Sequence, residues 1–263
     1  MNRVQRVFEK KAFIPFVTAG DPDLGVTEEL VVAMAEAGAD LIEIGIPFSD
    51  PVAEGVVIQE ADLRALASGT TTDKIFEMVK RVRIRTDVPL AFMTYINPVF
   101  VYGTDRFVKN AVEAGVDALI VPDMPFEERE ELLPACKAHG LTLIYLAAPT
   151  SRERVSAIAR ETDGFVYVVS SLGVTGVRSE ITTDIAGMVR TIKQEKNVPC
   201  AVGFGISTPE QARSMAAAAD GVIVGSAVVK LVARYGAECV EPVRRYVREM
   251  KEAVRSCAAR SSM

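Results

Sequence analysis

Short Val- and Ile-rich runs alternate with helical patterns along the chain, and this alternation limits the possible folds more than any other feature. The apolar runs lie near residues 13–19, 41–45, 90–95, 117–121, 141–146, 164–169, 198–202 and 220–224. Helical patterns lie near residues 26–37, 57–66, 71–85, 104–114, 127–138, 152–160, 184–195, 208–216 and 238–257. Repeated βα units of this kind predict a parallel sheet.

A weak internal repeat bears on how that sheet is closed. A helix end followed by Asp and an apolar strand recurs as EAGADLIEI, EAGVDALIV, ETDGFVYVV and AAADGVIVG. Like units favour a (β/α)8 barrel over two unlike domains, although a doubly wound sheet would use the same turns. The chain has 263 residues, and eight βα units typically close over roughly 250. We therefore predict an α/β fold, a TIM barrel formed as one domain by residues 1–263, with extra helices and a short N-terminal capping helix around Val4, Val7 and Phe8.

Charge and hydropathy exclude two classes of partner. The net charge is −5 and Lys and Arg are interspersed with acids, so the chain lacks the basic stripe that nucleic-acid binding requires. Hydrophobic residues make up 49% of the chain, yet no apolar run approaches the ~18 residues of a membrane span. The start, MNRVQRVFEKKAF, lacks the apolar core of a signal peptide. We expect a cytoplasmic protein.

Metal binding is not expected either. Cys136, Cys200, Cys239 and Cys257 are far apart and form no CxxC pair, and the single histidine, His139, precedes a glycine at a predicted helix end. These residues do not have the spacing of a metal site, and a position at a helix C-terminus accounts for the histidine. Any acid–base chemistry is therefore expected to fall to carboxylates or tyrosine.

One acid stands inside a predicted core strand. The stretch LIEIGIPFSDPVAEGVVI, residues 41–58, carries Glu43 in its apolar run and then Asp50 and Glu54 in a Pro-containing loop. An unpaired buried carboxylate is expensive, so it must be neutralised, paired or used. We predict that Glu43 is used in chemistry.

Glycines at the ends of the last two strands suggest a phosphate site. The run PCAVGFG precedes ISTPEQ, and the next strand ends in VGSA before another helical stretch. Backbone N–H groups and helix N-termini bind anions at this place in barrels. We predict that Gly203, Gly205, Gly225 and Ser226 form a phosphate cradle, although tight βα turns would also explain the glycines. The spacing of Ser207 and Glu210 predicts a capping box instead.

A further glycine-rich segment, SSLGVTGVRSE at residues 170–180, follows the strand that contains Tyr167. Its length and the glycines at positions 173 and 176 are typical of a lid that closes over a site, but a loop without function would read the same way. The Tyr167 phenol could bond a reacting group or fill the core.

Several of these segments together resemble one known family. In order, FVTAGDP, LIEIGIPFSDPVAEG, YINPVF, VPDMP, SLGVTG, GFGIS and VGSA resemble the tryptophan synthase alpha chain, and the match runs almost from end to end. This resemblance implies a (β/α)8 barrel that cleaves indole-3-glycerol phosphate to indole and glyceraldehyde 3-phosphate by a retro-aldol reaction. It also implies that no metal or organic cofactor is needed in this chain.

The resemblance also implies roles for individual residues. Glu43 matches the general acid–base glutamate, Tyr167 matches a site tyrosine, and Glu54 matches the loop acid that accepts the indole N–H. The family pattern most often has Asp where this chain has Glu54, and Pro where it has Val56. The expected substrate-binding residues are Phe16, Thr18, Met93, Tyr95, Ile120, Pro122, Thr175, Gly176 and Phe204, with Gly176 also at the phosphate.

A partner follows from the resemblance as well. The family implies a beta chain that carries pyridoxal phosphate, an alpha2-beta2 assembly, and an interface near Pro47 and Asp50. Two alternatives stay open from the residues alone. One is a phosphosugar isomerase of the same broad superfamily. The other is a catalytically weakened regulatory subunit that binds a phosphosugar and activates a beta partner.

Overall fold

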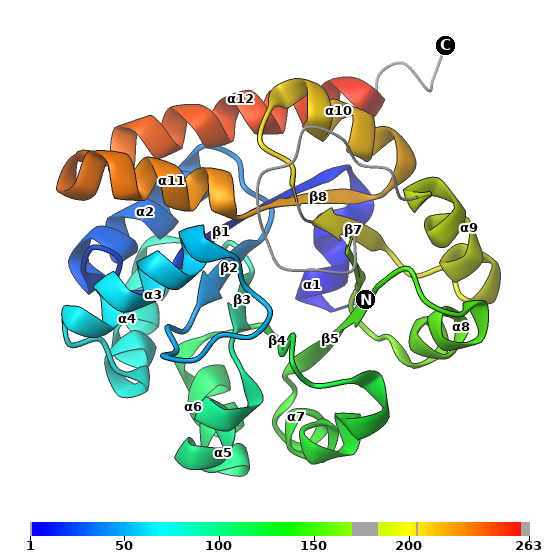
Figure 1. Ribbon diagram of the computed structural model, residues 1–263, viewed down its shortest axis with the longest axis horizontal. Helices are drawn as coiled ribbons and strands as arrows, with labels where there is room; N and C mark the ends of the chain where they lie inside the picture. The colour runs from blue at the N-terminus through cyan, green and yellow to red at the C-terminus, as the bar shows by residue number, and fades with distance from the viewer. Residues whose placement is uncertain (1, 170–183, 204, 259–263) are drawn as a thin grey trace.

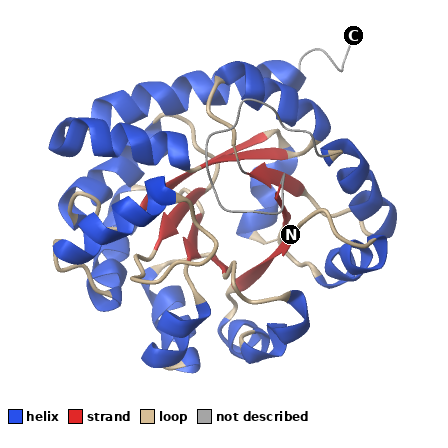
Figure 2. Cartoon of the chain, viewed as in Figure 1, coloured by secondary structure: helices blue, strands red, loops and turns tan. Residues whose placement is uncertain are grey.

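The apolar runs form the parallel strands of a closed barrel, as the alternation predicts. The structure, a computed structural model, describes residues 2–169, 184–203 and 205–258. The strands pair in chain order around the barrel, and helices surround them (Figures 1 and 2). The strands are β1 (Ala12–Thr18), β2 (Ile42–Gly45), β3 (Leu90–Met93), β4 (Ala118–Ile120), β5 (Thr142–Ala147), β6 (Val166–Val169), β7 (Cys200–Gly203) and β8 (Gly221–Val224).

Most of the helices lie close to the intervals that the sequence predicts. They are α1 (Arg3–Arg6), η1 (Val7–Glu9), α2 (Leu24–Glu36), α3 (Val56–Ala67), α4 (Thr72–Arg85), α5 (Ile96–Tyr102), α6 (Thr104–Ala114), η2 (Phe126–Glu131), α7 (Leu133–His139), α8 (Arg152–Glu161), α9 (Ile185–Glu195), α10 (Pro209–Ala218), α11 (Ser226–Tyr235), η3 (Gly236–Glu238) and α12 (Val240–Ala258). The short α5 was not predicted. The helix expected at 127–138 is two elements, η2 and α7, because a new helix begins at Leu133 with Pro134 in its first turn, a position that proline favours.

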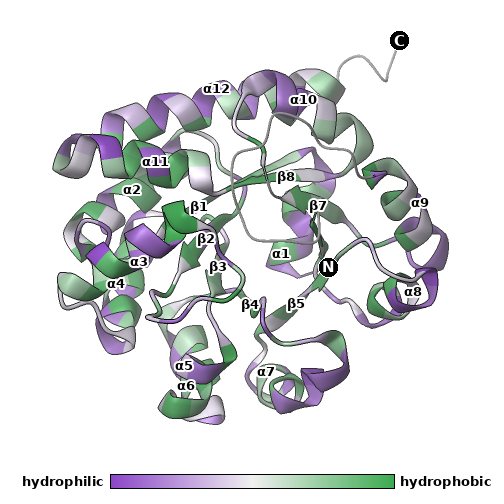
Figure 3. Ribbon diagram, viewed as in Figure 1, coloured by the Kyte–Doolittle hydropathy of each residue, from purple (hydrophilic) through white to green (hydrophobic). Residues whose placement is uncertain are grey.

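The strands are buried on both faces, which is why they read as nearly continuous apolar runs. In β1, Phe13 and Val17 belong to the core between strands and helices, while Ala12 and Ile14 belong to the core inside the barrel. Figure 3 shows the strands mainly in hydrophobic green and the helices in both colours. The last helix, α12, packs against α10 and α2.

The recurring Asp of the internal repeat has a structural role. At three of the four repeats the carboxylate accepts the backbone N–H of a neighbouring strand and pairs with a cation from a surrounding helix. These sets are Asp40 with Phe13 N–H and Lys251, Asp117 with Leu90 N–H and Arg83, and Asp220 with Cys200 N–H and Lys193. The repeat therefore marks where helices are fastened to the starts of strands.

The N-terminal segment closes the barrel at the end where the strands begin, which confirms the predicted cap. Val4 is buried in the inner core, and the rings of Phe8 and Phe165 lie 5.2 Å apart between centroids. The side chain of Asn2 donates to Thr142 Oγ1 and to the Asp163 carbonyl. The opposite end, where the strands finish, is left for a site.

One predicted helix cap needs correction. The predicted capping box of Ser207 and Glu210 is wrong, because Thr208 caps α10 and Gln211 completes the box.

Pro15 lies inside β1. It is the last residue of this strand that pairs with β8, and pairing with β2 begins at Phe16. The N–H group that proline lacks therefore falls at the point where the pairing of β1 changes from β8 to β2. The assignment of residues 1–263 to one domain stays a prediction.

Candidate active site

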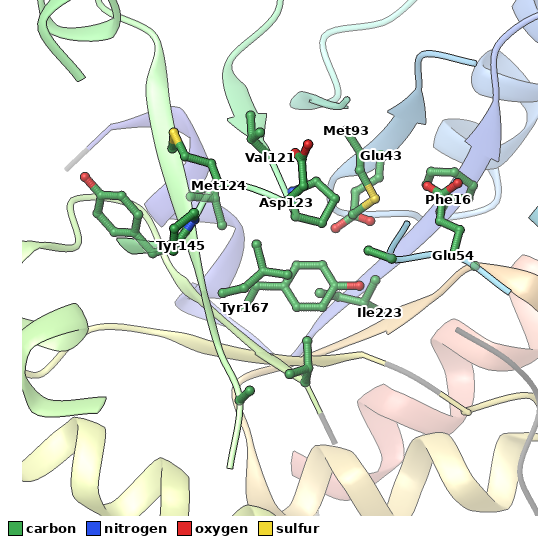
Figure 4. Close-up of a pocket in the computed structure, with 18 of the residues that line it drawn as sticks. Phe16, Glu43, Glu54, Met93, Val121, Asp123, Met124, Tyr145, Tyr167 and Ile223 are labelled. Carbon is green, nitrogen blue, oxygen red and sulfur yellow. The ribbon is translucent and has the colours of Figure 1, made fainter. Parts of the chain in front are cut away.

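A cavity of about 420 Å³ opens at the carboxyl ends of the strands. Figure 4 shows its side chains converging from strands and loops on several sides. Enzymes built on this barrel place their sites at this end. The predicted residues that line it are Phe16, Glu43, Glu54, Met93, Pro122, Tyr167, Gly205, Gly225 and Ser226.

Glu43 is held on a rigid strand with no compensating partner. It lies in β2, in register with Phe16 of β1 and Ala91 of β3, and is 1% exposed. Neither carboxyl oxygen has a hydrogen-bond partner among the described residues. Burial alone raises the pKa of Glu43 to about 8, because desolvation disfavours the charged form. At neutral pH the group is therefore mainly a protonated acid that faces the cavity.

Glu54 comes from the loop before α3 and is also buried, at 7% exposure. Its Oε2 atom is buried without a partner among the described residues, and its carboxyl group hydrogen-bonds that of Asp62 in α3. Burial raises the pKa of Glu54 to about 7. Burial and the charge of Glu54 raise the pKa of Asp62 to about 9. The hydrogen bond between the two groups acts in opposite directions, lowering the pKa of Glu54 and raising that of Asp62.

Sequence reasoning missed Asp62. It is 4% exposed, on the same face of α3 as Ile58 and Ala65. Ile58 lies four residues before Asp62 and Ala65 three residues after it. This helical spacing places all three residues on one face, and it could have indicated from the sequence that Asp62 is buried.

The loop between β2 and α3 is fastened at several points. The backbone N–H of Ala53 donates to the hydroxyl of Tyr95 at 3.0 Å, and the rings of Phe48 and Tyr95 lie 5.4 Å apart between centroids. Gln59 Nε2 donates to the Glu54 carbonyl at 2.7 Å. Tyr95, which was expected to contact substrate, lies outside the cavity lining and holds this loop.

Tyr167 in β6 points its phenol into the cavity, toward the side that holds Glu43 and Glu54 (Figure 4). Burial, and then the charge of Glu43, raise the pKa of Tyr167 well above its ordinary value. The group is therefore a neutral hydrogen-bonding phenol. A Cβ atom at Gly203 would lie 2.6 Å from Cε1 and from Oη of this ring. Gly203 thus makes room for Tyr167 and lies outside the cavity lining.

Three further predicted phosphate residues, Gly205, Gly225 and Ser226, line the cavity. Gly225 precedes α11, Ser226 is its first residue, and Gly205 has a φ of +79°, which favours glycine. The N-terminus of α11 therefore lies at the cavity. The first N–H groups of a helix have no intrahelical partner, so a helix start in this position is able to bind an anion.

The remaining predicted residues fall into three groups. Thr18 and Ile120 are buried beside the cavity without lining it. Thr175, Gly176 and Phe204 lie outside the described residues, as does the expected lid at 170–180. Of the interface residues, Pro47 is buried and Asp50 is exposed in the isolated chain.

Part of the lining was not predicted. It includes Val121, Asp123, Met124, Phe126, Tyr145, Leu146 and Ile223. Asp123 accepts the backbone N–H of Ile96 at 3.0 Å, and burial raises its pKa. This side of the cavity is mainly apolar and aromatic, which suits a flat hydrophobic ring.

The described residue ranges contain no cluster of three or more His, Cys, Asp and Glu that could hold a metal ion. None of their helices has the length and hydropathy to cross a membrane. His139 ends α7 before Gly140, as expected, and its Nε2 lies 2.8 Å from Asp105 Oδ1.

Comparisons with known proteins agree with this geometry. A sequence model of the family "Tryptophan synthase alpha chain" matches residues 4–255. The alpha chain of Lacticaseibacillus casei is 48% identical over 255 residues, 97% of this chain and 96% of that protein. The alpha chain of Citrifermentans bemidjiense is 52% identical over 247 residues, 93% of this chain and 92% of that protein.

Solved structures give the same answer. The tryptophan synthase alpha chain of Legionella pneumophila superposes with a TM-score of 0.87 at 38% identity, over 97% of each chain. A chain of the tryptophan synthase complex of Pyrococcus furiosus gives 0.84 at 37% identity, over 92% of this chain and 98% of that one. With its family match covering nearly every residue, the chain belongs to the tryptophan synthase alpha chain family.

Proposed function

We propose that Glu43 is the general acid and base of this chain and that Glu54 binds the indole nitrogen. The chain is a lyase of tryptophan biosynthesis that cleaves indole-3-glycerol phosphate to indole and glyceraldehyde 3-phosphate. The observation that carries the proposal is the buried carboxyl of Glu43, which lines the cavity with both oxygens unpartnered among the described residues.

The carbon–carbon cleavage requires two proton transfers at neighbouring atoms. Protonated Glu43 donates its proton to C3 of the indole ring, which makes the ring an electron acceptor. The hydroxyl of the glycerol chain then loses its proton to the Glu43 carboxylate, its carbon becomes the aldehyde, and the bond electrons return to the ring. Glu43 ends with the proton count with which it began. A pKa of about 8 keeps the acid form abundant at neutral pH, as a general acid requires.

Glu54 assists through the ring nitrogen. Its carboxylate accepts the indole N–H and so stabilises the positive charge that develops on the protonated ring. Glu54 lines the cavity that would hold this ring. The neutral phenol of Tyr167 stands beside Glu43 and fixes the substrate between the two carboxyl groups.

The phosphate group anchors the other end of the substrate. We place it at Gly205, Gly225 and Ser226, where the N-terminus of α11 faces the cavity. Binding energy gained at this remote group orients the bond that breaks. The roles of Thr175, Gly176 and Phe204 stay predictions.

The alpha chain family does not itself bind pyridoxal phosphate, and we propose that this chain works without any cofactor of its own. It pairs with a tryptophan synthase beta chain, and we propose an alpha2-beta2 assembly with exposed Asp50 near the contact. A cytoplasmic location is likewise a proposal, supported by the four cysteines, all of which are free thiols.

The two alternatives are not favoured. Membership of the family argues against an isomerase of another kind. A regulatory subunit that has lost catalysis does not account for Glu43, because an unpaired buried acid destabilises a fold that does not use it.

The test measures indole released from indole-3-glycerol phosphate by the purified chain, with and without its beta partner. We expect Glu43→Gln to lower kcat by about 10²–10⁴-fold, the usual contribution of a positioned acid–base group. Glu60→Gln, an exposed acid on α3, is the control and keeps full activity. Indole release that is unaffected by Glu43→Gln would contradict the mechanism. No release with saturating beta chain, but retained binding of the phosphosugar, would favour the regulatory alternative.

A further inference from the structure

Asp62 is a buried acid to which the proposed mechanism assigns no task. It lies two helical turns after Glu54, in the part of α3 that faces the loop, and is 4% exposed. Its carboxyl group makes two contacts, one with the Glu54 carboxyl and one with the backbone N–H of Phe48. It therefore joins α3 to the loop and to the loop's functional acid.

The surroundings of this pair contain no free cation within the described residues. Arg64 of α3 is engaged by Asp21, with Nε and one terminal nitrogen each 2.8 Å from a carboxylate oxygen. The other titratable groups that face the pair are Asp21 and the phenol of Tyr95. Two buried carboxyl groups in contact cannot both ionise without a cation, so they share one proton.

The hydrogen bond between Asp62 and Glu54 favours one arrangement of the shared proton. Asp62 donates to Glu54 when it is protonated, and this hydrogen bond favours the ionised form of Glu54. The contact with Asp62 uses part of the hydrogen-bonding capacity of the Glu54 carboxyl, and Glu54 itself lines the cavity. The arrangement orients a carboxylate, which is the form that can accept the indole N–H.

We propose that Asp62 is a positioning residue for the cleavage reaction: its carboxyl, held by the Phe48 N–H, orients the Glu54 carboxyl toward the indole nitrogen. This inference rests on the proposed role of Glu54. It also explains how a glutamate works where the family pattern most often has an aspartate, since the extra rotatable bond of Glu54 needs a second point of attachment.

The test compares Asp62→Asn, Asp62→Ala and the control Glu60→Gln in the complex with the beta chain. Asparagine can still donate to Glu54 and accept from Phe48 N–H, so it keeps most of the activity. Alanine removes both bonds, and we expect kcat/KM to fall by about 10–100-fold, the range for a misoriented or unsupported charged group. All variants are first checked for native unfolding transitions in urea.

Two readouts separate positioning from mere support of the fold. Loss of the hydrogen bond raises the pKa of Glu54, so the acid limb of the kcat/KM profile moves to higher pH in Asp62→Ala and not in Asp62→Asn. In a Glu54→Gln background, Asp62→Ala has little further effect. Equal losses in both backgrounds, an unmoved acid limb, or asparagine no better than alanine would overturn the inference.

The outcomes also distinguish this inference from the proposed function. If the wild-type complex releases no indole, or if Glu43→Gln has no effect, the proposed function fails. If cleavage depends on Glu43 and Glu54 but not on Asp62, only the inference fails.

Discussion

Replacing Glu43 by glutamine is expected to stabilise the fold, and by an amount that grows with pH. The carboxyl is 1% exposed and unpartnered among the described residues. Its pKa rises from an ordinary 4.5 to about 8 because of burial. Glutamine has the same shape and no charge, so it removes the titration and leaves the packing in place.

The sign and size follow from proton linkage. Between pH 4.5 and 8 the folded chain holds a proton on Glu43 that the unfolded chain has lost. The free energy of unfolding therefore falls by about 1.4 kcal/mol for each pH unit in this window, and is level above it. The loss amounts to about 3 kcal/mol at pH 7 and about 4 kcal/mol at pH 8, and it levels off near about 5 kcal/mol at higher pH. Glu43→Gln does not have this loss.

Urea unfolding of the isolated chain at pH 5, 6, 7, 8 and 9 measures the effect. The buried amide adds a cost of about 1–3 kcal/mol that does not depend on pH. The test is therefore the slope, against pH, of the difference in unfolding free energy between Glu43→Gln and wild type. Contributions of Glu54 and Asp62 are common to both proteins and cancel. Two parallel stability curves would refute the reasoning, since they would mean that Glu43 has an ordinary pKa. The exposed control Glu60→Gln should run parallel to wild type.

Three further changes test other parts of the structure. Gly203→Ala places a methyl group 2.6 Å from Tyr167 Oη, so the phenol must move, and we expect kcat to fall by about 10²-fold; a crystal structure with an unmoved ring would contradict this. Ser226→Asp puts a negative charge at the start of α11, which should raise stability by about 0.3–1 kcal/mol while raising KM strongly by repelling the phosphate; an unchanged KM would place the phosphate elsewhere. Phe165→Ala removes a fully buried ring that packs on Phe8 and should cost about 3–5 kcal/mol in urea unfolding, more than the half-buried Phe8→Ala.

The barrel could be predicted because its strands are buried on both faces. Such strands stand out as apolar runs, and an acid within one, Glu43, stands out as well. The glycines after β7 and β8 were found in the same way, from a residue type that only a turn or a close approach requires.

Asp62 shows a limit of sequence reasoning. Its spacing from Ile58 and Ala65 indicates the buried face of α3, but the contacts that its carboxyl makes with Glu54 and Phe48 depend on how the loop packs. Tyr95 shows the related limit for strand ends. Alternation indicates which way a side chain points, but not whether its hydroxyl meets substrate or, as here, the N–H of Ala53.

The packing of Phe8 against Phe165 has a consequence for how substrate enters the site and how products leave it. Among the described residues, the N-terminal segment covers the starts of the strands, and the cavity lies at their other end. Substrate and products are therefore expected to pass the rim at that end, where a protein that docks near Asp50 would also lie. A bound partner would then control the rate of turnover by limiting how fast indole is released, even without contact to a reacting atom.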